Sequence, residues 1–126
     1  MAPAQGQLKP PYDVAVAYDE ALAGRIRELI GDDPSVTERK MFGGLAFLVA
    51  GHMAVSASGQ GGIMIRVNPA EADSLVASTQ ASVAVMRDRP MPGWLRVASE
   101  HLGTEEELGL WVEQGTNYAR SLPPKS

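Results

Sequence analysis

The sequence contains no cysteine and only two histidines, His52 and His101. The missing cysteine excludes thiolate catalysis, disulfides and cysteine-bound zinc. The histidines stand 49 positions apart without an H-E-x-x-H motif, so we expect neither a metal site nor a cofactor. No apolar run approaches the roughly 20 residues of a membrane span. The first residues lack the basic and apolar regions of a signal peptide, so we expect a cytoplasmic protein.

Recognisable catalytic patterns are also missing. The chain has no G-x-S-x-G motif, and its serines stand without an obvious base. The adjacent carboxylates of Glu105, Glu106 and Glu107 are explained by the first turn of a helix, where the helix dipole favours negative charge. We therefore expect that the protein is not an enzyme.

The net charge of −4 disfavours a general nucleic-acid binder, because such proteins gain affinity from a basic surface. The middle of the chain is nevertheless slightly positive, with six basic and four acidic residues between Val36 and Ser99. A local surface that attracts anions is compatible with this distribution, and direct DNA binding is not expected. The six basic residues are Arg39, Lys40, Arg66, Arg87, Arg89 and Arg96.

At 126 residues the chain fits one domain. Residues 1–16 are rich in proline and glutamine without periodicity, which predicts a disordered leader before a domain spanning residues 17–124. An apolar stripe predicts a first helix over residues 19–30, which Gly31 ends. Alternating residues then predict strands from Val36 to Phe42, on both sides of Ala50-Gly51, and over residues 63–67.

The second half continues with helices and two more strands. Asn68 and Pro69 are typical of a helix start, and short strands are expected over residues 83–86 and 94–97, on either side of a connection at 87–93. A capping box at Thr104 and Glu107 opens a last helix of roughly 18 residues. Gly115 lies within its apolar face, which predicts a close approach of the helix backbone to the sheet.

Burial suggests a register for the second and third strands. A three-residue loop would place Leu45, Phe47 and Val49 opposite Ala57, Val55 and Met53 on one face. Ala46, Leu48, Ala54 and Ser56 would then form the other face. Because Ala46, Leu48 and Ala54 would make that second face apolar, a homodimer that buries it is a candidate assembly.

The element order is α-β-β-β-β-α-β-β-α. Grouped strands, rather than strictly alternating βα units, indicate an α+β fold: a two-layer sandwich with a mainly antiparallel sheet covered by helices.

Several stretches resemble the N-terminal domain of the TfoX/Sxy family over about residues 17–124. They are Tyr18-Asp19-Glu20, "RKMFGGLAFLVAGHMA" from Arg39, "MIRV" from Met64, "GWLRV" from Gly93 and "WVEQGTNYARSLP" from Trp111. The resemblance implies a small α+β sandwich related to secretion-chaperone-like domains. The family takes its name from bacterial regulators of natural competence, which resemble transcriptional co-activators. This chain has one domain, whereas the full-length regulators have a second, C-terminal domain.

The resemblance and the residues together favour a non-enzymatic regulatory module that binds another protein, with the transcription machinery as a candidate partner. The alternative is a domain that binds a small anionic ligand or nucleotide through the same basic positions. The glycines of "SGQGG" (58–62) are not expected to form a phosphate cradle, because they precede a strand rather than a helix. The Met-Phe-Gly-Gly corner is interpreted mainly as the bend that starts the sheet, with binding as the alternative. The candidate binding surface comprises Lys40, Phe42, Gly43, Gly44, Arg66, Arg89, Trp94 and Arg96.

Overall fold

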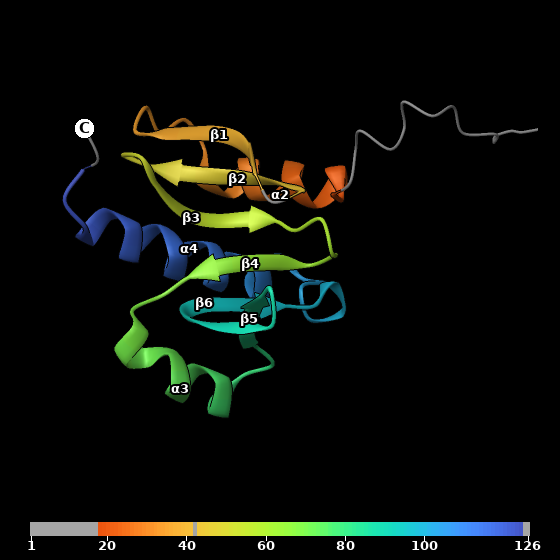
Figure 1. Cartoon of the computed structure of the whole chain (residues 1–126). Coiled ribbons are helices and arrows are strands. Elements are labelled where there is room, and N and C mark those ends of the chain that lie inside the picture. The colour runs from red at the N-terminus through yellow and green to blue at the C-terminus, as the bar shows by residue number, and fades with distance from the viewer. Residues whose placement is uncertain (1–17, 42, 125–126) are drawn as a thin grey trace, which may run out of the picture.

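The computed structural model describes residues 18–41 and 43–124, and a six-stranded antiparallel sheet forms its centre (Figure 1). The strand order is β1-β2-β3-β4-β6-β5. The predicted leader and Phe42 lie outside the described residues. The strands are β1 (Val36–Met41), β2 (Gly44–Val49), β3 (His52–Ala57), β4 (Ile63–Arg66), β5 (Ser82–Met86) and β6 (Arg89–Val97). The helices are α2 (Glu20–Ile30), α3 (Pro69–Ser78) and α4 (Glu105–Ser121), with a 3₁₀ turn η2 (Ser99–His101). The predicted α+β class and element order are confirmed.

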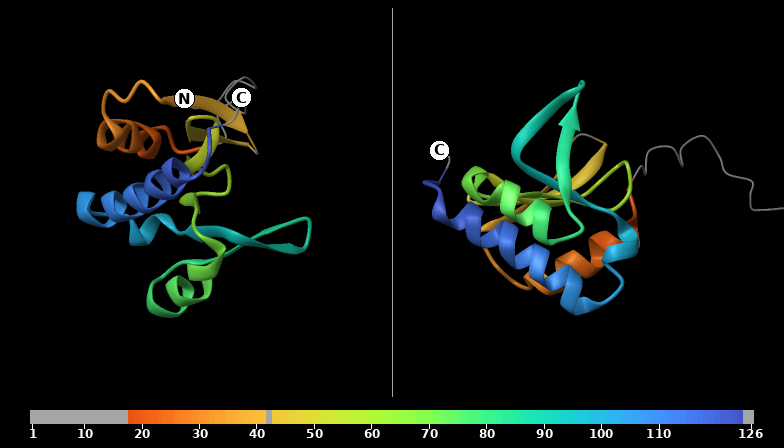
Figure 2. Two further views of the ribbon diagram at one scale, coloured as in Figure 1. Left: turned by 90° about the vertical axis from the view of Figure 1, so that its left-hand side faces the viewer. Right: turned by 90° about the horizontal axis from the view of Figure 1, so that it is seen from below.

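Helices α2 and α4 cover one face of the sheet (Figures 1 and 2). Both begin at a capping residue: Asp19 accepts a hydrogen bond from the Leu22 amide, and Thr104 forms with Glu107 the reciprocal capping box that the sequence predicted. The main core lies between these helices and the sheet. Its largest buried side chains include Ile26, Phe47, Ile63, Ile65, Leu95 and Leu108.

Gly115 sets the distance between α4 and the sheet. A Cβ atom added to this residue would lie 2.4 Å from the Ala54 carbonyl oxygen and 2.9 Å from Ile65 Cγ2. The first contact is with backbone, which has no rotamer to change, so only glycine fits without a shift of the helix. The close approach predicted from the sequence is confirmed.

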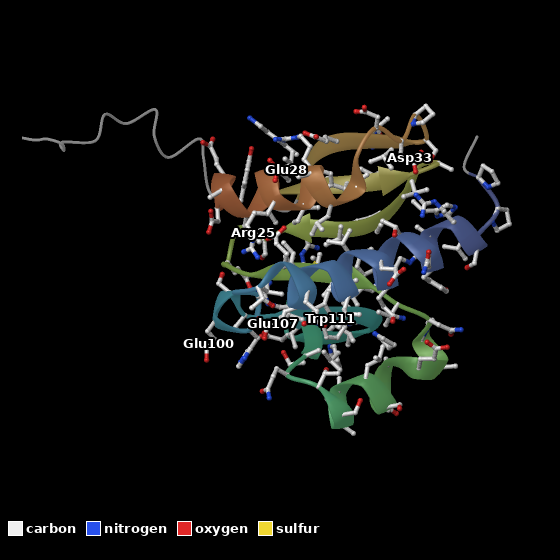
Figure 3. All side chains as sticks on the ribbon, turned by 180° about the vertical axis from the view of Figure 1, so that it is seen from behind. Arg25, Glu28, Asp33, Glu100, Glu107 and Trp111 are labelled. Atoms are coloured by element: carbon white, nitrogen blue, oxygen red, sulfur yellow. The ribbon has the colours of Figure 1, made fainter. Side chains whose placement is uncertain are left out.

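Three ion pairs at the surface connect α2 with α4, α2 with β1, and α4 with the loop between α2 and β1. Arg25 of α2 bonds Glu105 of α4 at 2.8 Å, and Arg27 bonds Glu38 of β1 at 2.6 and 2.9 Å. Arg120 near the end of α4 bonds Asp33 in the loop between α2 and β1 (Figure 3). These exposed pairs fix the relative positions of the elements more than they add stability.

The register predicted for β2 and β3 is right at one end and wrong at the other. Leu45 pairs with Ala57 and Phe47 with Val55 as expected, but Leu48 pairs with Met53 and Val49 with His52. The loop has two residues, Ala50 and Gly51, both with positive φ, a geometry that matches the twist of a hairpin. Ala54 is the extra residue of a bulge, so Met53 faces away from the main core.

The connection predicted at residues 87–93 is also wrong, because β6 begins at Arg89. Arg87 and Asp88 form a two-residue turn, both with positive φ. Two prolines in this stretch disfavour a strand with neighbours on both sides. The first part of β6 has a neighbour on one side only, because only residues 94–97 of β6 pair with β4. Pro90 therefore has no neighbour on its second side, and its missing N–H costs no ladder bond. This hairpin end projects from the sheet on the side opposite α2 and α4 (Figure 2); we call residues 85–92 the arm.

A second, smaller apolar cluster lies on the face of the sheet that α2 and α4 leave open. Its buried members are Ala46, Leu48, Met53, Met64 and Ala84, and Met41 and Trp94 pack against them. The apolar face expected to drive a homodimer is therefore not available: Ala46 and Leu48 are already buried in the single chain, and Ala54 lies in the main core.

We expect Gly115→Ala to lower the free energy of unfolding by about 1–3 kcal/mol, because the added methyl group meets backbone. Gly109→Ala on the same helix is the matched control, since its Cβ would meet only Leu29 Cδ2 at 3.8 Å. The control should be neutral or more stable by up to about 1 kcal/mol, from helix propensity. Urea unfolding measures both variants, and equal stability of the two would contradict the assigned contact.

A second prediction concerns pH. Hydrogen bonds from the Ser35 hydroxyl, the Ser35 amide and Arg120 lower the pKa of Asp33 from 3.8 to about 2. A carboxylate whose pKa is lowered in the folded state stabilises it fully above its unfolded pKa, and the effect is lost as the pH falls through the folded value. Between about pH 4 and pH 2, the wild-type protein should therefore lose stability more steeply than Asp33→Asn.

Urea unfolding at a series of pH values measures this difference. Asp32→Asn is the control, since no hydrogen bond to the side chain of Asp32 occurs among residues 18–41 and 43–124, and it should keep the wild-type slope. Parallel curves for wild type and Asp33→Asn would show that these hydrogen bonds are absent in solution.

Candidate functional site

The structure separates the two basic residues expected to define the binding surface. Lys40 is exposed on the edge strand β1 opposite Leu45, whose side chain lies in the main core. Arg66 lies opposite Trp94, which packs on the second cluster. Directly opposed residues of antiparallel strands share a face, so Lys40 and Arg66 point to opposite sides of the sheet. Arg39, not Lys40, shares the face of Arg66.

The Gly43-Gly44 corner is a structural bend. Gly43 has a φ of +76°, and a Cβ on Gly44 would lie 2.2 Å from the Ala57 carbonyl oxygen. The corner therefore packs backbone against the end of β3, which supports the interpretation as a bend that starts the sheet. Phe42, the remaining member of this corner among the candidates, lies outside the described part of the chain.

Arg96 is occupied by contacts within the protein. Its guanidinium donates to Ser58 Oγ and to the Gly61 carbonyl oxygen, both at 2.9 Å. These bonds hold the loop between β3 and β4 against β6. The loop amides are occupied as well: Gln60 and Gly61 donate to Ser58, and Gly62 donates to Ser99 Oγ. The arrangement leaves these three amides and Arg96 unavailable for a phosphate, in line with the sequence argument against a cradle.

Arg66 makes contacts of a different kind. Its Cζ atom lies 5.3 Å from the ring centroid of Trp94 and 5.8 Å from that of Tyr118. Two cation–π contacts hold the guanidinium in place while leaving its five N–H donors free of a carboxylate partner in the described residues. Arg66 and Trp94 were both predicted site residues, and the structure brings them together.

The most distinctive feature of the sheet face opposite α2 and α4 is its methionine content. Five of the six methionines of the chain gather there, each from a different strand. Four of them line a small hollow of about 60 Å³ at the base of the arm, beside Ala84 and Val85. We call the five methionines and Trp94 the methionine face. The methionines are Met41, Met53, Met64, Met86 and Met91.

Arg89, another predicted site residue, is exposed at the start of β6, opposite Met86. Of the methionine face, the sequence singled out only Trp94, because single methionines dispersed over five strands resemble ordinary core residues. The available signal was their register: once strands are paired, positions that alternate with the main core fall on one side.

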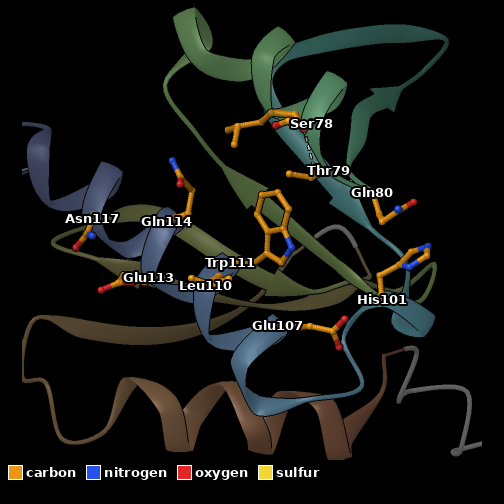
Figure 4. A pocket seen from close by; sticks show the side chains of 11 residues that line it. Ser78, Thr79, Gln80, His101, Glu107, Leu110, Trp111, Glu113, Gln114 and Asn117 are labelled. Carbon is orange, nitrogen blue, oxygen red and sulfur yellow. Dashed lines mark hydrogen bonds between the residues drawn. The ribbon is translucent and has the colours of Figure 1, made fainter.

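A groove of about 670 Å³ lies elsewhere, between α3 and α4. Trp111 points from α4 toward the C-terminal end of α3 and forms the centre of the groove, with Glu107 and His101 at one end and Gln114 and Asn117 at the other (Figure 4). No lysine or arginine lines it. The groove thus offers an apolar floor with a polar, negatively charged rim.

The hydroxyl groups of this groove and the carboxylate of Glu107 are engaged in structural bonds. Ser78 and Thr79 donate to the Ser74 and Leu75 carbonyl oxygens of their own helix. Glu107 Oε1 accepts the capping bonds from Thr104. A nucleophile and a base within hydrogen-bond reach of each other do not occur among these lining residues.

The two histidines occupy separate places. His52 Nε2 lies 2.6 Å from the Pro123 carbonyl oxygen, and its buried Nδ1 has no hydrogen-bond partner. His101 lies at the groove, 3.6 Å from Glu100. Within residues 18–41 and 43–124, no three His, Cys, Asp or Glu side chains come together as a metal site. No helix in this part of the chain combines the length and apolar character of a membrane span.

A helix-covered antiparallel sheet with a partly open second face defines a small α+β domain. The model of the TfoX N-terminal domain matches residues 28–119, nearly three quarters of the chain. The chain belongs to this family, and at the family level it is a competence-regulator-like domain. No curated protein and no solved structure matches it.

The contacts of Arg96 lead to a prediction that separates folding from binding. Arg96→Met should lower the free energy of unfolding by about 1–3 kcal/mol, since two hydrogen bonds to a charged donor are lost. Arg89→Met, on the exposed start of the same strand, should change it by less than about 0.5 kcal/mol. Thermal or urea unfolding tests the pair. If Arg96→Met is as stable as Arg89→Met, Arg96 is free in solution and returns to the candidate binding residues.

Proposed function

We propose that this protein is a non-enzymatic regulatory module that binds another protein through the methionine face. The observation that carries the proposal is the collection of methionines around the base of the arm. Methionine has an unbranched, polarisable side chain, so a methionine-lined surface adapts to different apolar partners. Family membership makes the transcription machinery the first place to look for the partner.

The charges around this face indicate the chemistry of the partner. Arg39, Arg66 and Arg89 lie on or beside it, against Asp88 at the tip of the arm. An apolar partner segment flanked by acidic residues would therefore complement both the methionines and the cations. The stacked guanidinium of Arg66 is pre-organised, which reduces the entropy lost when it binds a carboxylate.

The alternative, a small anionic ligand or nucleotide, receives less support from the geometry. Arg96 and three amides of the glycine loop are engaged in internal bonds, and Lys40 faces the other side of the sheet. Arg89 lines a hollow of about 740 Å³ along the arm, but apart from Arg87 the other side chains of this hollow are methionine, proline and tryptophan, which suit an apolar partner better than an anion. The groove between α3 and α4 is large enough, but its carboxylates would repel an anion.

A pull-down with matched variants tests the proposal. Tagged wild-type protein, Met91→Glu and Leu110→Glu are incubated with nuclease-treated lysate, and captured proteins are quantified by mass spectrometry. Met91 belongs to the methionine face, whereas Leu110 is 64% exposed at the rim of the α3–α4 groove. We expect a captured protein whose recovery falls about tenfold or more with Met91→Glu and stays unchanged with Leu110→Glu.

Circular dichroism confirms first that both variants are folded. The reverse pattern, loss with Leu110→Glu alone, would move the binding site to the groove. Equal recovery from all three proteins would leave no specific partner and contradict the proposed function.

A further inference from the structure

The two edge strands of the sheet are built differently. The edge strand β1 carries the charged residues Glu38, Arg39 and Lys40 at its centre, all of them exposed. Charges in this position prevent another strand from pairing with the edge. The opposite edge, β5, has the sequence Ser82-Val83-Ala84-Val85-Met86, with neither a charge nor a proline. Of the two edge strands, only β1 is therefore protected by charged side chains.

The hydrogen bonds of β5 show which groups the open edge offers. Met86 and Arg89 close the two-residue turn of the arm, and such a closing pair exchanges both of its backbone hydrogen bonds. In the next pair, Val85 and Pro90, the N–H and C=O groups consequently point outward. Among residues 18–41 and 43–124, β5 pairs with β6 alone, and no further hydrogen bond to Val85 occurs.

The side chain at this position is exposed as well. Val85 is 58% exposed. Among the described residues, the other exposed large apolar side chains are Leu29 and Leu110. β-branched residues favour strand pairing, since they pack well against neighbours on a pleated surface. The bulge between Val83 and Val85 limits the regular edge to the part of β5 nearest the turn.

We propose that the β5 edge pairs with the β5 edge of a second copy of this chain. The occupant is a second copy because β5 is complementary to itself: it is valine-rich and uncharged, so two antiparallel copies meet without like charges. Arg87 and Asp88, the first charged residues after the strand, are adjacent and opposite in sign, so they add no net repulsion. The dimer is closed by a two-fold axis, and the two β5–β6 hairpin ends join into one ribbon.

Sedimentation equilibrium and light scattering test the dimer without any knowledge of the partner. We expect wild-type protein to approach twice the chain mass of 13.4 kDa as its concentration rises. Val85→Lys should raise the dissociation constant of the dimer by about tenfold or more, because two ammonium groups would meet near the axis. Thr37→Lys, which adds the same charge to the exposed edge strand β1, should leave dimerisation unchanged.

Amide hydrogen exchange supplies a second measurement. Protection of the Val85 amide should rise with protein concentration in the wild type and not in Val85→Lys. A protein that keeps the mass of one chain at millimolar concentration, or a Val85→Lys variant that dimerises like the wild type, would overturn the proposal. These results are independent of the pull-down, since Met91→Glu leaves the β5 edge intact.

Discussion

The contact between Gly115 of α4 and the Ala54 carbonyl of β3 is the constraint on which the two layers depend. It brings helix backbone against sheet backbone, so the separation of the layers does not depend on a side-chain rotamer. The bulge at Ala54 belongs to the same contact, because the extra residue of β3 lies beneath the helix. The bulge also turns Met53 to the other side of the sheet. One helix–sheet contact thereby contributes to the composition of both faces.

The two faces of the sheet differ in composition. Under α2 and α4, branched aliphatic residues and phenylalanine form a core of fixed shape. On the other face, methionine and alanine replace them, and at the end of β4 the Arg66 guanidinium contacts both Trp94 and Tyr118 of α4. A core composed for stability alone would use few methionines, because they specify a packing arrangement poorly. Their concentration on the face without α2 and α4 favours recognition.

The fold followed from the sequence wherever local signals agreed. The capping box at Thr104 and the close approach at Gly115 were both evident, because the signal for each lies in residues near in sequence. The errors occurred at the turns after Val49 and Met86. Ala50, Arg87 and Asp88 adopt a positive φ there and allow two-residue loops, a conformation that their residue types do not predict.

The candidate site was harder to predict because faces depend on register. Lys40 and Arg66 both looked like basic residues of neighbouring strands, and only the pairing of each strand assigns them to opposite sides. Arg66 and Trp94 were both predicted as site residues, because that prediction depended on their side-chain chemistry and not on the face of the sheet to which they belong. The methionine face could be recognised only after five strands were aligned, since each of its methionines lies on a different strand.

The two hydrogen bonds of Arg96 have a consequence for the thermodynamics of recognition. They join the β3–β4 loop to the strand that leads into the arm, so loop and strand base move as one unit. A partner that reaches the methionine face would meet a backbone already ordered. The entropy lost on binding would then come mainly from side-chain rotamers, and methionine rotamers can rearrange at little enthalpic cost. Such a surface tolerates variation in its partner without variation in its own fold.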